Sequence, residues 1–174
     1  NGIIVKDDIF FQNLIKNNEM LIRNYNEEDL KVNVIIPILN KIEFKSFENK
    51  FRDFYESSLN YETEKFIFNG TTDFVVSKGL FETEKPYFFI QEFKKGKTNS
   101  DPEPQLLAEL ISAVELNKET FMKGAYIIGE NWNFVILERL ELHKYQYFVS
   151  RTFNCTNIKD LKGIYKNLLF IKNE

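Results

Sequence analysis

The order of hydrophobic patterns along the chain is the feature that most limits its fold. Four segments carry apolar residues at helical spacing: residues 9–22, 26–42, 103–117 and 158–171. Six segments are rich in β-branched and aromatic residues, as strands are: residues 65–69, 71–77, 87–94, 125–129, 134–138 and 145–149. Helices, three strands, a helix and further strands in this order predict an α/β fold with a mixed sheet flanked by helices.

Turn-forming residues separate these segments. Pro37 should kink or interrupt the second helix, because proline lacks the amide hydrogen that a helix interior needs. Gly70 is expected to form a turn between two strands, and residues 95–104 have loop chemistry throughout. Residues 130–133 are expected to join the next two strands. Residues 43–62 are polar and aromatic without a clear period, and their structure stays unassigned.

The composition supports one packed domain. A length of 174 residues suits a single domain over residues 1–174, and 18 Phe and 8 Tyr indicate a packed core rather than a disordered chain. The formal net charge of −3 is unlike that of proteins held to nucleic acid by bulk charge. Nucleic acid stays open as a partner, since a carboxylate-lined metal site is itself acidic.

Cysteine and histidine are too scarce for disulfides or zinc. With Cys155 and His143 as single representatives, an internal disulfide and a Cys/His zinc site are excluded, and both residues are interpreted as structural. We expect a reduced, cytoplasmic setting. No apolar run approaches the roughly 18 residues of a membrane span, so no membrane partner is expected. The chain opens on Asn1 rather than methionine, and we expect it to be a domain of a longer protein.

One acidic–x–lysine triplet stands out by its context. Such triplets begin at five acidic residues: Asp29, Glu43, Glu48, Glu92 and Asp160. Among them, only Glu92-x-Lys94 ends an apolar strand. Side chains alternate along a strand, so Glu92 and Lys94 share one face. Charged groups at the end of a buried strand need compensation, and a divalent cation is one such compensation.

Asp73 adds a second carboxylate to this strand end. If the strand that carries Asp73 pairs with the strand of Glu92, the two carboxylates lie side by side and repel each other unless a proton or a cation intervenes. Mg²⁺ binds one or two carboxylates, with water and substrate phosphate as further ligands. Lys94 would orient or deprotonate the attacking water, while the metal stabilises charge on the phosphate. These groups indicate phosphodiester hydrolysis.

These motifs resemble the PD-(D/E)xK nuclease superfamily. Asp73, followed 19 residues later by Glu92-Phe93-Lys94, is similar to its core. More specifically, residues 26–140 resemble the nuclease domain near the N-terminus of type I restriction enzyme R subunits and of related stand-alone bacterial proteins. The Pro-x-Leu ending at residues 37–39 and the strand pair at residues 123–134 belong to the same resemblance. The resemblance implies a restriction-endonuclease-like αβββαβ core.

The resemblance also implies a full site. It assigns Mg²⁺, replaceable by Mn²⁺, to Asp73, Glu92, the Phe93 carbonyl and Glu27, with Lys94 beside the water and Gln105 assisting. Glu28 is the fallback for Glu27. Two departures concern Thr72, where the family name has proline, and Glu109, where some relatives carry tyrosine.

The implied function is metal-dependent hydrolysis of DNA by an endonuclease domain of a restriction-type system. Its expected partners are DNA, other restriction subunits or domains, and further copies of the chain. No P-loop motif occurs, so a motor would lie elsewhere. Two alternatives stay open. The fold could serve as a non-catalytic module that binds nucleic acid or protein, or the nuclease could act on RNA.

Simpler explanations exist for each candidate residue. Asp73 and Glu92 could face solvent at strand ends, and Lys94 could form a surface ion pair with Glu92. Glu27 could favour a helix start through the dipole, and Gln105 could be an ordinary first-turn residue.

Three other residues have an alternative role in DNA contact. Lys95 and Lys97 could touch the phosphate backbone, although a solvated loop explains them as well. Trp132 could stack on a base, but packing at a hairpin tip is the preferred interpretation.

Overall fold

The computed structural model describes residues 5–63, 67–96 and 101–173, with side chains from residue 7 on. Within these ranges one sheet contains eight strands, in the order β1-β2-β3-β4-β5-β6-β7, with β8 paired to β6. Their bounds are β1 (Lys45–Ser46), β2 (Phe51–Glu62), β3 (Ile67–Lys78), β4 (Glu84–Lys94), β5 (Phe121–Ile128), β6 (Asn131–Glu141), β7 (Lys144–Val149) and β8 (Phe153–Asn154). All pairs are antiparallel except the parallel pair β4–β5.

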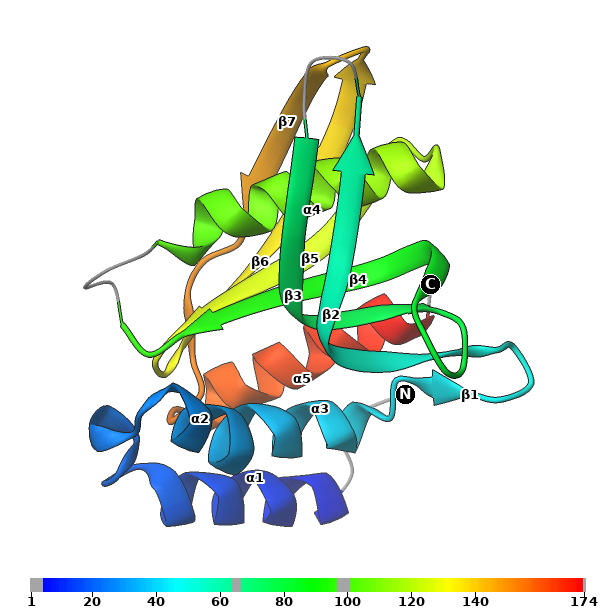
Figure 1. Cartoon of the computed structure of the whole chain (residues 1–174). Helices are drawn as coiled ribbons and strands as arrows, with labels where there is room; N and C mark the ends of the chain where they lie inside the picture. Colours follow the sequence, from blue (N-terminus) through cyan, green and yellow to red (C-terminus); the bar gives the residue numbers. More distant parts are fainter. Residues whose placement is uncertain (1–4, 64–66, 97–100, 174) are drawn as a thin grey trace.

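Helices cover both faces of this sheet. They are α1 (Val5–Asn18), the 3₁₀ turn η1 (Ile22–Asn24), α2 (Glu27–Leu30), the π turn η2 (Lys31–Ile35), α3 (Ile36–Ile42), α4 (Pro102–Asn117) and α5 (Ile158–Asn173). α4 lies on one face, and α1, α3 and α5 lie on the other (Figure 1). The predicted α/β class, with a mixed sheet flanked by helices, is confirmed. Among the described residues, no helix has both the length and the apolar character needed to cross a membrane.

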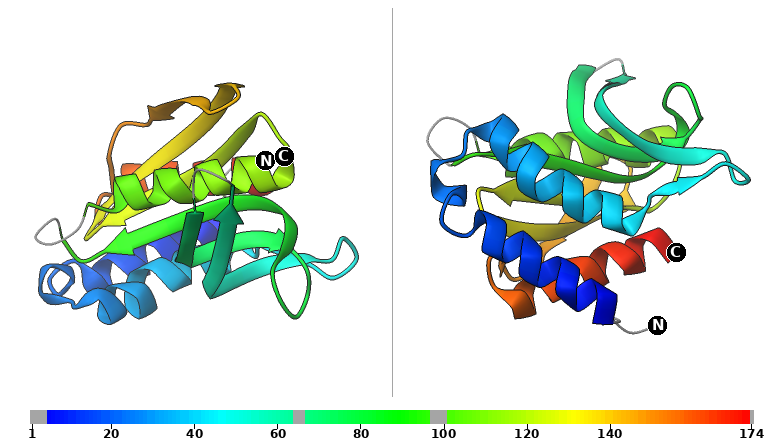
Figure 2. Two further views of the ribbon diagram at one scale, coloured as in Figure 1. Left: turned by 45° about the horizontal axis from the view of Figure 1, so that its top comes forward. Right: turned by 90° about the horizontal axis from the view of Figure 1, so that it is seen from below.

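The sheet curves around α4. This helix crosses from β4 to the parallel strand β5, and it also contacts β2, β3 and β6. The outer parts of β2 and β3 bend away from β4 toward α4 (Figure 2). As a result, β3 and β4 pair over only part of their length.

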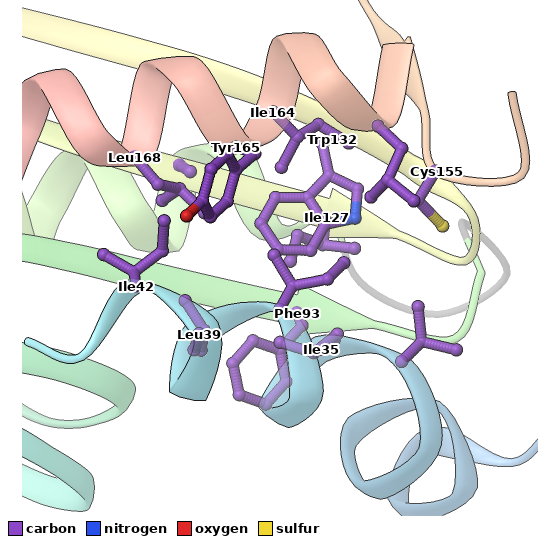
Figure 3. Packing of buried hydrophobic residues seen from close by; sticks show 14 of the residues in the cluster. Ile35, Leu39, Ile42, Phe93, Ile127, Trp132, Cys155, Ile164, Tyr165 and Leu168 are labelled. Carbon is purple, nitrogen blue, oxygen red and sulfur yellow. The ribbon is translucent and has the colours of Figure 1, made fainter. Parts of the chain in front are cut away.

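Two apolar cores hold the layers together. One joins the sheet to α1, α3 and α5, and the other joins it to α4. Trp132 lies in the first core with no exposed surface, beside Phe93, Ile35 and Cys155 (Figure 3). Burial of Trp132 excludes the alternative that it stacks on a nucleic-acid base. It also replaces the expected packing at a hairpin tip with packing in the core.

The break expected at Pro37 takes the form of a wide helical turn. The amide of Ile36 donates to the carbonyl of Lys31, five residues earlier, and Pro37 then stands in the first turn of α3. Proline has no amide hydrogen and its ring crowds the carbonyl four residues back. The π turn relieves this crowding, so α2, η2 and α3 follow one another without a loop.

One segment without a prediction contains strands, and one prediction about the strands was wrong. The unassigned residues 43–62 contain β1 and the long strand β2. The predicted strands 65–69 and 71–77 belong to one strand, β3, which runs through Gly70 opposite Leu59; residues 64–66 lie outside the described ranges. The ring of Phe68 lies 2.5 Å from where a Cβ of Gly70 would be, so this glycine makes room for a ring rather than a turn.

Candidate active site

Asp73 and Glu92 lie where β3 and β4 separate. The last paired residues are Phe74 and Gln91, and the next position on each strand carries a carboxylate. Glu92 Oε1 accepts the amide hydrogen of Asp73 at 3.0 Å, and Asp73 Oδ2 accepts that of Phe93 at 2.9 Å. The side chains thus replace the ladder hydrogen bonds that the strands lose as they diverge. The two carboxylates are neighbours, as the predicted strand pairing required.

Glu92 points away from solvent toward α4, where it meets Glu109. Both side chains are fully buried. Gln105 Nε2 donates to Glu109 Oε1 at 3.3 Å, one helical turn away. Within the described part of the chain, Glu92 Oε2 and Glu109 Oε2 have no donor group to bind. Two buried carboxylates in contact need a shared proton or a cation between them.

The pKa values of Glu92 and Glu109 are both raised, as expected for two buried carboxyl groups in contact. Burial, together with repulsion from Glu109 and Asp73, raises the pKa of Glu92 to about 10. Burial raises the pKa of Glu109 to about 7, although hydrogen bonds from Gln105 and Glu92 oppose the increase. Without a cation, Glu92 therefore holds a proton at neutral pH.

Lys94 and Glu27 form the solvent side of the site. Lys94 ends β4, and its Nζ lies 3.8 Å from Glu27 Oε1. Glu27 is the first residue of α2, whose start is fixed by a capping box in which Asn26 and Asp29 each bind the backbone of the other. Lys94 thus pairs with Glu27 rather than with Glu92, and the position of Glu27 depends on the helix cap.

The structure brings together Asp73, Glu92, Lys94 and Glu27, and Gln105 reaches them through Glu109. Glu109 was not predicted as a site residue. Its signal in the sequence was a glutamate on the same helix face as the buried Leu106, Leu110 and Ala113, where an ionised side chain is costly. This is also the position at which the sequence departs from the resembled family.

The donor groups suit a hard cation such as Mg²⁺, which binds carboxylate and carbonyl oxygens. The unpaired oxygens of Glu92 and Glu109 are buried atoms that a cation would satisfy. However, no group of three or more His, Cys, Asp or Glu side chains in the described ranges has an arrangement that could hold a metal ion. Side chains would have to turn to hold one, because Asp73 and Glu92 each direct an oxygen at a backbone amide.

Two hollows of about 510 and 490 Å³ lie away from these carboxylates. They share Pro86, Phe88 and Ile171, at the opposite end of β4. The carboxylates lie instead where β3 and β4 separate. Lys95 follows the last residue of β4 directly, whereas Lys97 lies outside the described residues.

No family model, curated protein or solved structure matches this chain. An assignment of function therefore depends on the residues of the site.

Proposed function

We propose that this chain is a PD-(D/E)xK-type nuclease domain that hydrolyses DNA phosphodiester bonds with the help of Mg²⁺ or Mn²⁺. One observation carries the proposal. Asp73 and Glu92 lie side by side at the separation of two strands, with Lys94 two residues further along the same strand. Paired carboxylates and a lysine where two strands separate are the groups that metal-assisted phosphodiester hydrolysis needs.

The order of elements supports the proposal. The helical segment α2–α3, the strands β2, β3 and β4, the helix α4 and the strand β5 follow one another as α, β, β, β, α, β. This is the order of the restriction-endonuclease-like core, with β2 in place of the first strand that the sequence predicted. The four candidate side chains come from α2, β3 and β4.

Each residue of the site has a proposed role that follows from its position. Asp73, Glu92 and the Phe93 carbonyl would hold the cation, with Glu27 on the solvent side. When bound, the cation withdraws charge from the scissile phosphate and acidifies a bound water. Lys94, in ion-pair distance of Glu27, would hold that water by its ammonium hydrogens and direct its oxygen at phosphorus. Gln105 holds Glu109, which contacts the buried side of Glu92.

The proposal includes a setting. In a restriction-type system, other domains or subunits supply the motor and the sequence recognition. Two copies of the site would cut the two strands of a duplex, so DNA, such subunits and a second copy are the proposed partners. A cytoplasmic location belongs to the same proposal.

A second candidate is a non-catalytic module that binds nucleic acid or protein. The observation that favours it is the metal-free arrangement, in which Glu92 is protonated at neutral pH and no described group of side chains is ready for a metal. In such a module the carboxyl pair would serve only to join β4 to α4.

A cleavage assay separates the candidates. Duplex DNA, single-stranded DNA and RNA of one sequence are incubated with the chain in Mg²⁺, Mn²⁺ or EDTA. We expect metal-dependent cutting of DNA that falls by at least about 100-fold in Asp73→Asn and Lys94→Ala. The exposed Glu19→Gln should cut normally. Faster cutting of RNA would move the proposal to RNA, and DNA binding without cutting would favour the module.

A further inference from the structure

A second lysine borders the site from the same helical segment as Glu27. Lys31 follows Glu27 by four residues, so the two side chains leave the helix on the same side. Glu27 reaches Lys94 on β4, whereas Lys31 Nζ lies 2.5 Å from Glu56 Oε1 on β2. One helical turn therefore contacts β4 through Glu27 and β2 through Lys31.

Glu56 and Asp73 occupy the position at which the ladder between β2 and β3 is interrupted. Along the described parts of β2 and β3, the ladder pairs Tyr55 with Phe74 and Ser57 with Thr72 but omits the pair between them, Glu56 with Asp73. Glu56 has a φ of 49°, in the left-handed region that residues with a Cβ rarely adopt. Strained backbone of this kind is concentrated at binding and catalytic sites. The Glu56 carboxylate lies against the ammonium of Lys31.

The side chain of Lys31 is largely buried. Only 13% of its side chain is exposed, against 58% for Glu56. Its ammonium lies 5.4 Å from the centroid of the Phe93 ring, and it is close enough to Asp73 to feel that charge. An ammonium has three hydrogens, and Glu56 binds through a single oxygen. Hydrogen-bonding capacity therefore remains beside Asp73.

Phosphate needs more positive charge than Lys94 supplies. Four further carboxyl groups lie in or next to the site and would repel an anion. They belong to Glu27, Glu56, Asp73 and Glu109. Lys94 is the last residue of β4, and Lys31 pairs with Glu56 on β2, so the two ammonium groups are held by different strands near the carboxylates. A DNA phosphate at Asp73 would then have Lys31 as a second cation besides Lys94.

We infer that Lys31 binds a non-bridging oxygen of the DNA phosphate at this site, and that Glu56 is the positioning residue that aims it. This inference rests on the proposed nuclease function. A simple structural tether between η2 and β2 would explain the ion pair as well, but it would contribute nothing to DNA affinity.

The salt dependence of DNA binding tests the inference. A labelled duplex is titrated in EDTA with the Glu92→Gln chain as the parent, from about 20 to 200 mM salt, where each phosphate contact contributes about 0.9 to the slope of log K against log salt. We expect Lys31→Met to reduce the slope by about 0.9 and Lys31→Arg to preserve it. The exposed Lys166→Met, with the same change of charge on α5, should leave the slope unchanged.

Two variants of Glu56 test whether this residue positions Lys31. Glu56→Gln keeps an acceptor for Lys31 and should bind DNA at least as tightly as the parent. Glu56→Ala removes that acceptor and should lower the slope as Lys31→Met does. Unfolding of every variant is followed by circular dichroism, and Lys31→Gln replaces Lys31→Met if the latter does not fold.

The outcomes distinguish a failure of the inference about Lys31 from a failure of the nuclease proposal. If Lys31→Met loses thermal stability but keeps the parent slope, Lys31 is a tether and this inference is wrong, while the nuclease proposal stands. If the parent binds no DNA even at about 20 mM salt, both are overturned.

Discussion

Glu92 is a buried side chain that the fold favours in its protonated form, whereas the proposed cation needs it ionised. Its carboxyl group is fully buried beside Glu109 and near Asp73, which raises its pKa to about 10. A buried charge without a partner is among the costliest features a fold can contain. The amide hydrogen that Glu92 accepts from Asp73 favours the ionised carboxylate, but burial outweighs this effect and the metal-free side chain is protonated. The proposed cation would replace that proton.

Replacing Glu92 by glutamine should stabilise the metal-free protein. The pKa is near 4.5 in the unfolded chain and about 10 in the folded one, so the stability of the unaltered protein falls as pH rises between these values. Glutamine stays neutral and keeps the acceptor oxygen. In urea unfolding with EDTA, we expect Glu92→Gln to be more stable by on the order of 2 kcal/mol at pH 7, and by more at pH 9.

Glu19→Gln, an exposed change, serves as the control and should alter neither stability nor its pH dependence. An unaltered protein whose stability is flat from pH 6 to pH 9, together with a less stable Glu92→Gln, would contradict this account of the carboxyl pair.

The sequence allowed part of the site to be predicted at this scale. Asp73 and Glu92 lie on strands that are adjacent in sequence and pair as antiparallel neighbours, so their contact follows from local order. Glu109 meets Glu92 only because α4 packs on the sheet with one particular rotation. That rotation depends on Leu106, Leu110 and the strands beneath them. A single helix pattern does not determine it.

Among the elements, α2 is short and depends on its cap. Asn26 Oδ1 accepts the amide hydrogen of Asp29 at 2.8 Å, and Asp29 Oδ2 accepts that of Asn26. Asn26→Ala removes one half of this box and should lower the free energy of unfolding by about 1 kcal/mol, whereas Asn26→Ser should keep most of it. Urea unfolding measures both. Equal stability of Asn26→Ala and the unaltered chain would show that the cap does not fix Glu27.

The strands show why the remaining elements were harder to predict. β2 has few fully buried positions among its 12 residues, because its outer half extends past the sheet body, so its sequence carries no clean alternation. Gly70 was interpreted as a turn because glycine commonly marks one. In β3 the Phe68 ring instead occupies the space that a Cβ of Gly70 would need, an arrangement that no turn rule describes.

For the whole molecule, the mixed sheet and its flanking helices followed from the order of patterns, but the curvature around α4 did not. Curvature arises from packing: α4 contacts β2 and β3 on one side and β5 and β6 on the other. The divergence of β3 from β4 at Asp73 is a consequence of that packing.

The fluorescence of Trp132 can be used to follow whether this packing is intact. It is the single tryptophan of the chain and is fully buried between β6 and the helical layer. We expect its fluorescence to resist quenching by acrylamide until the protein unfolds in urea, and to stay unchanged when DNA is added. A free tryptophan derivative supplies the reference for full quenching. Quenching by DNA at constant fold would place Trp132 in a binding surface and contradict the structure.

The most direct test of the central claim is calorimetry of Mn²⁺ binding at pH 7, repeated in buffers with different heats of ionisation. Metal ligands must be deprotonated, so a cation at Asp73 and Glu92 has to displace the proton that Glu92 holds. The account predicts one binding event that releases about one proton and is lost in both Asp73→Asn and Glu92→Gln. Absence of binding, or binding that persists in both variants, would contradict a metal site at these carboxylates.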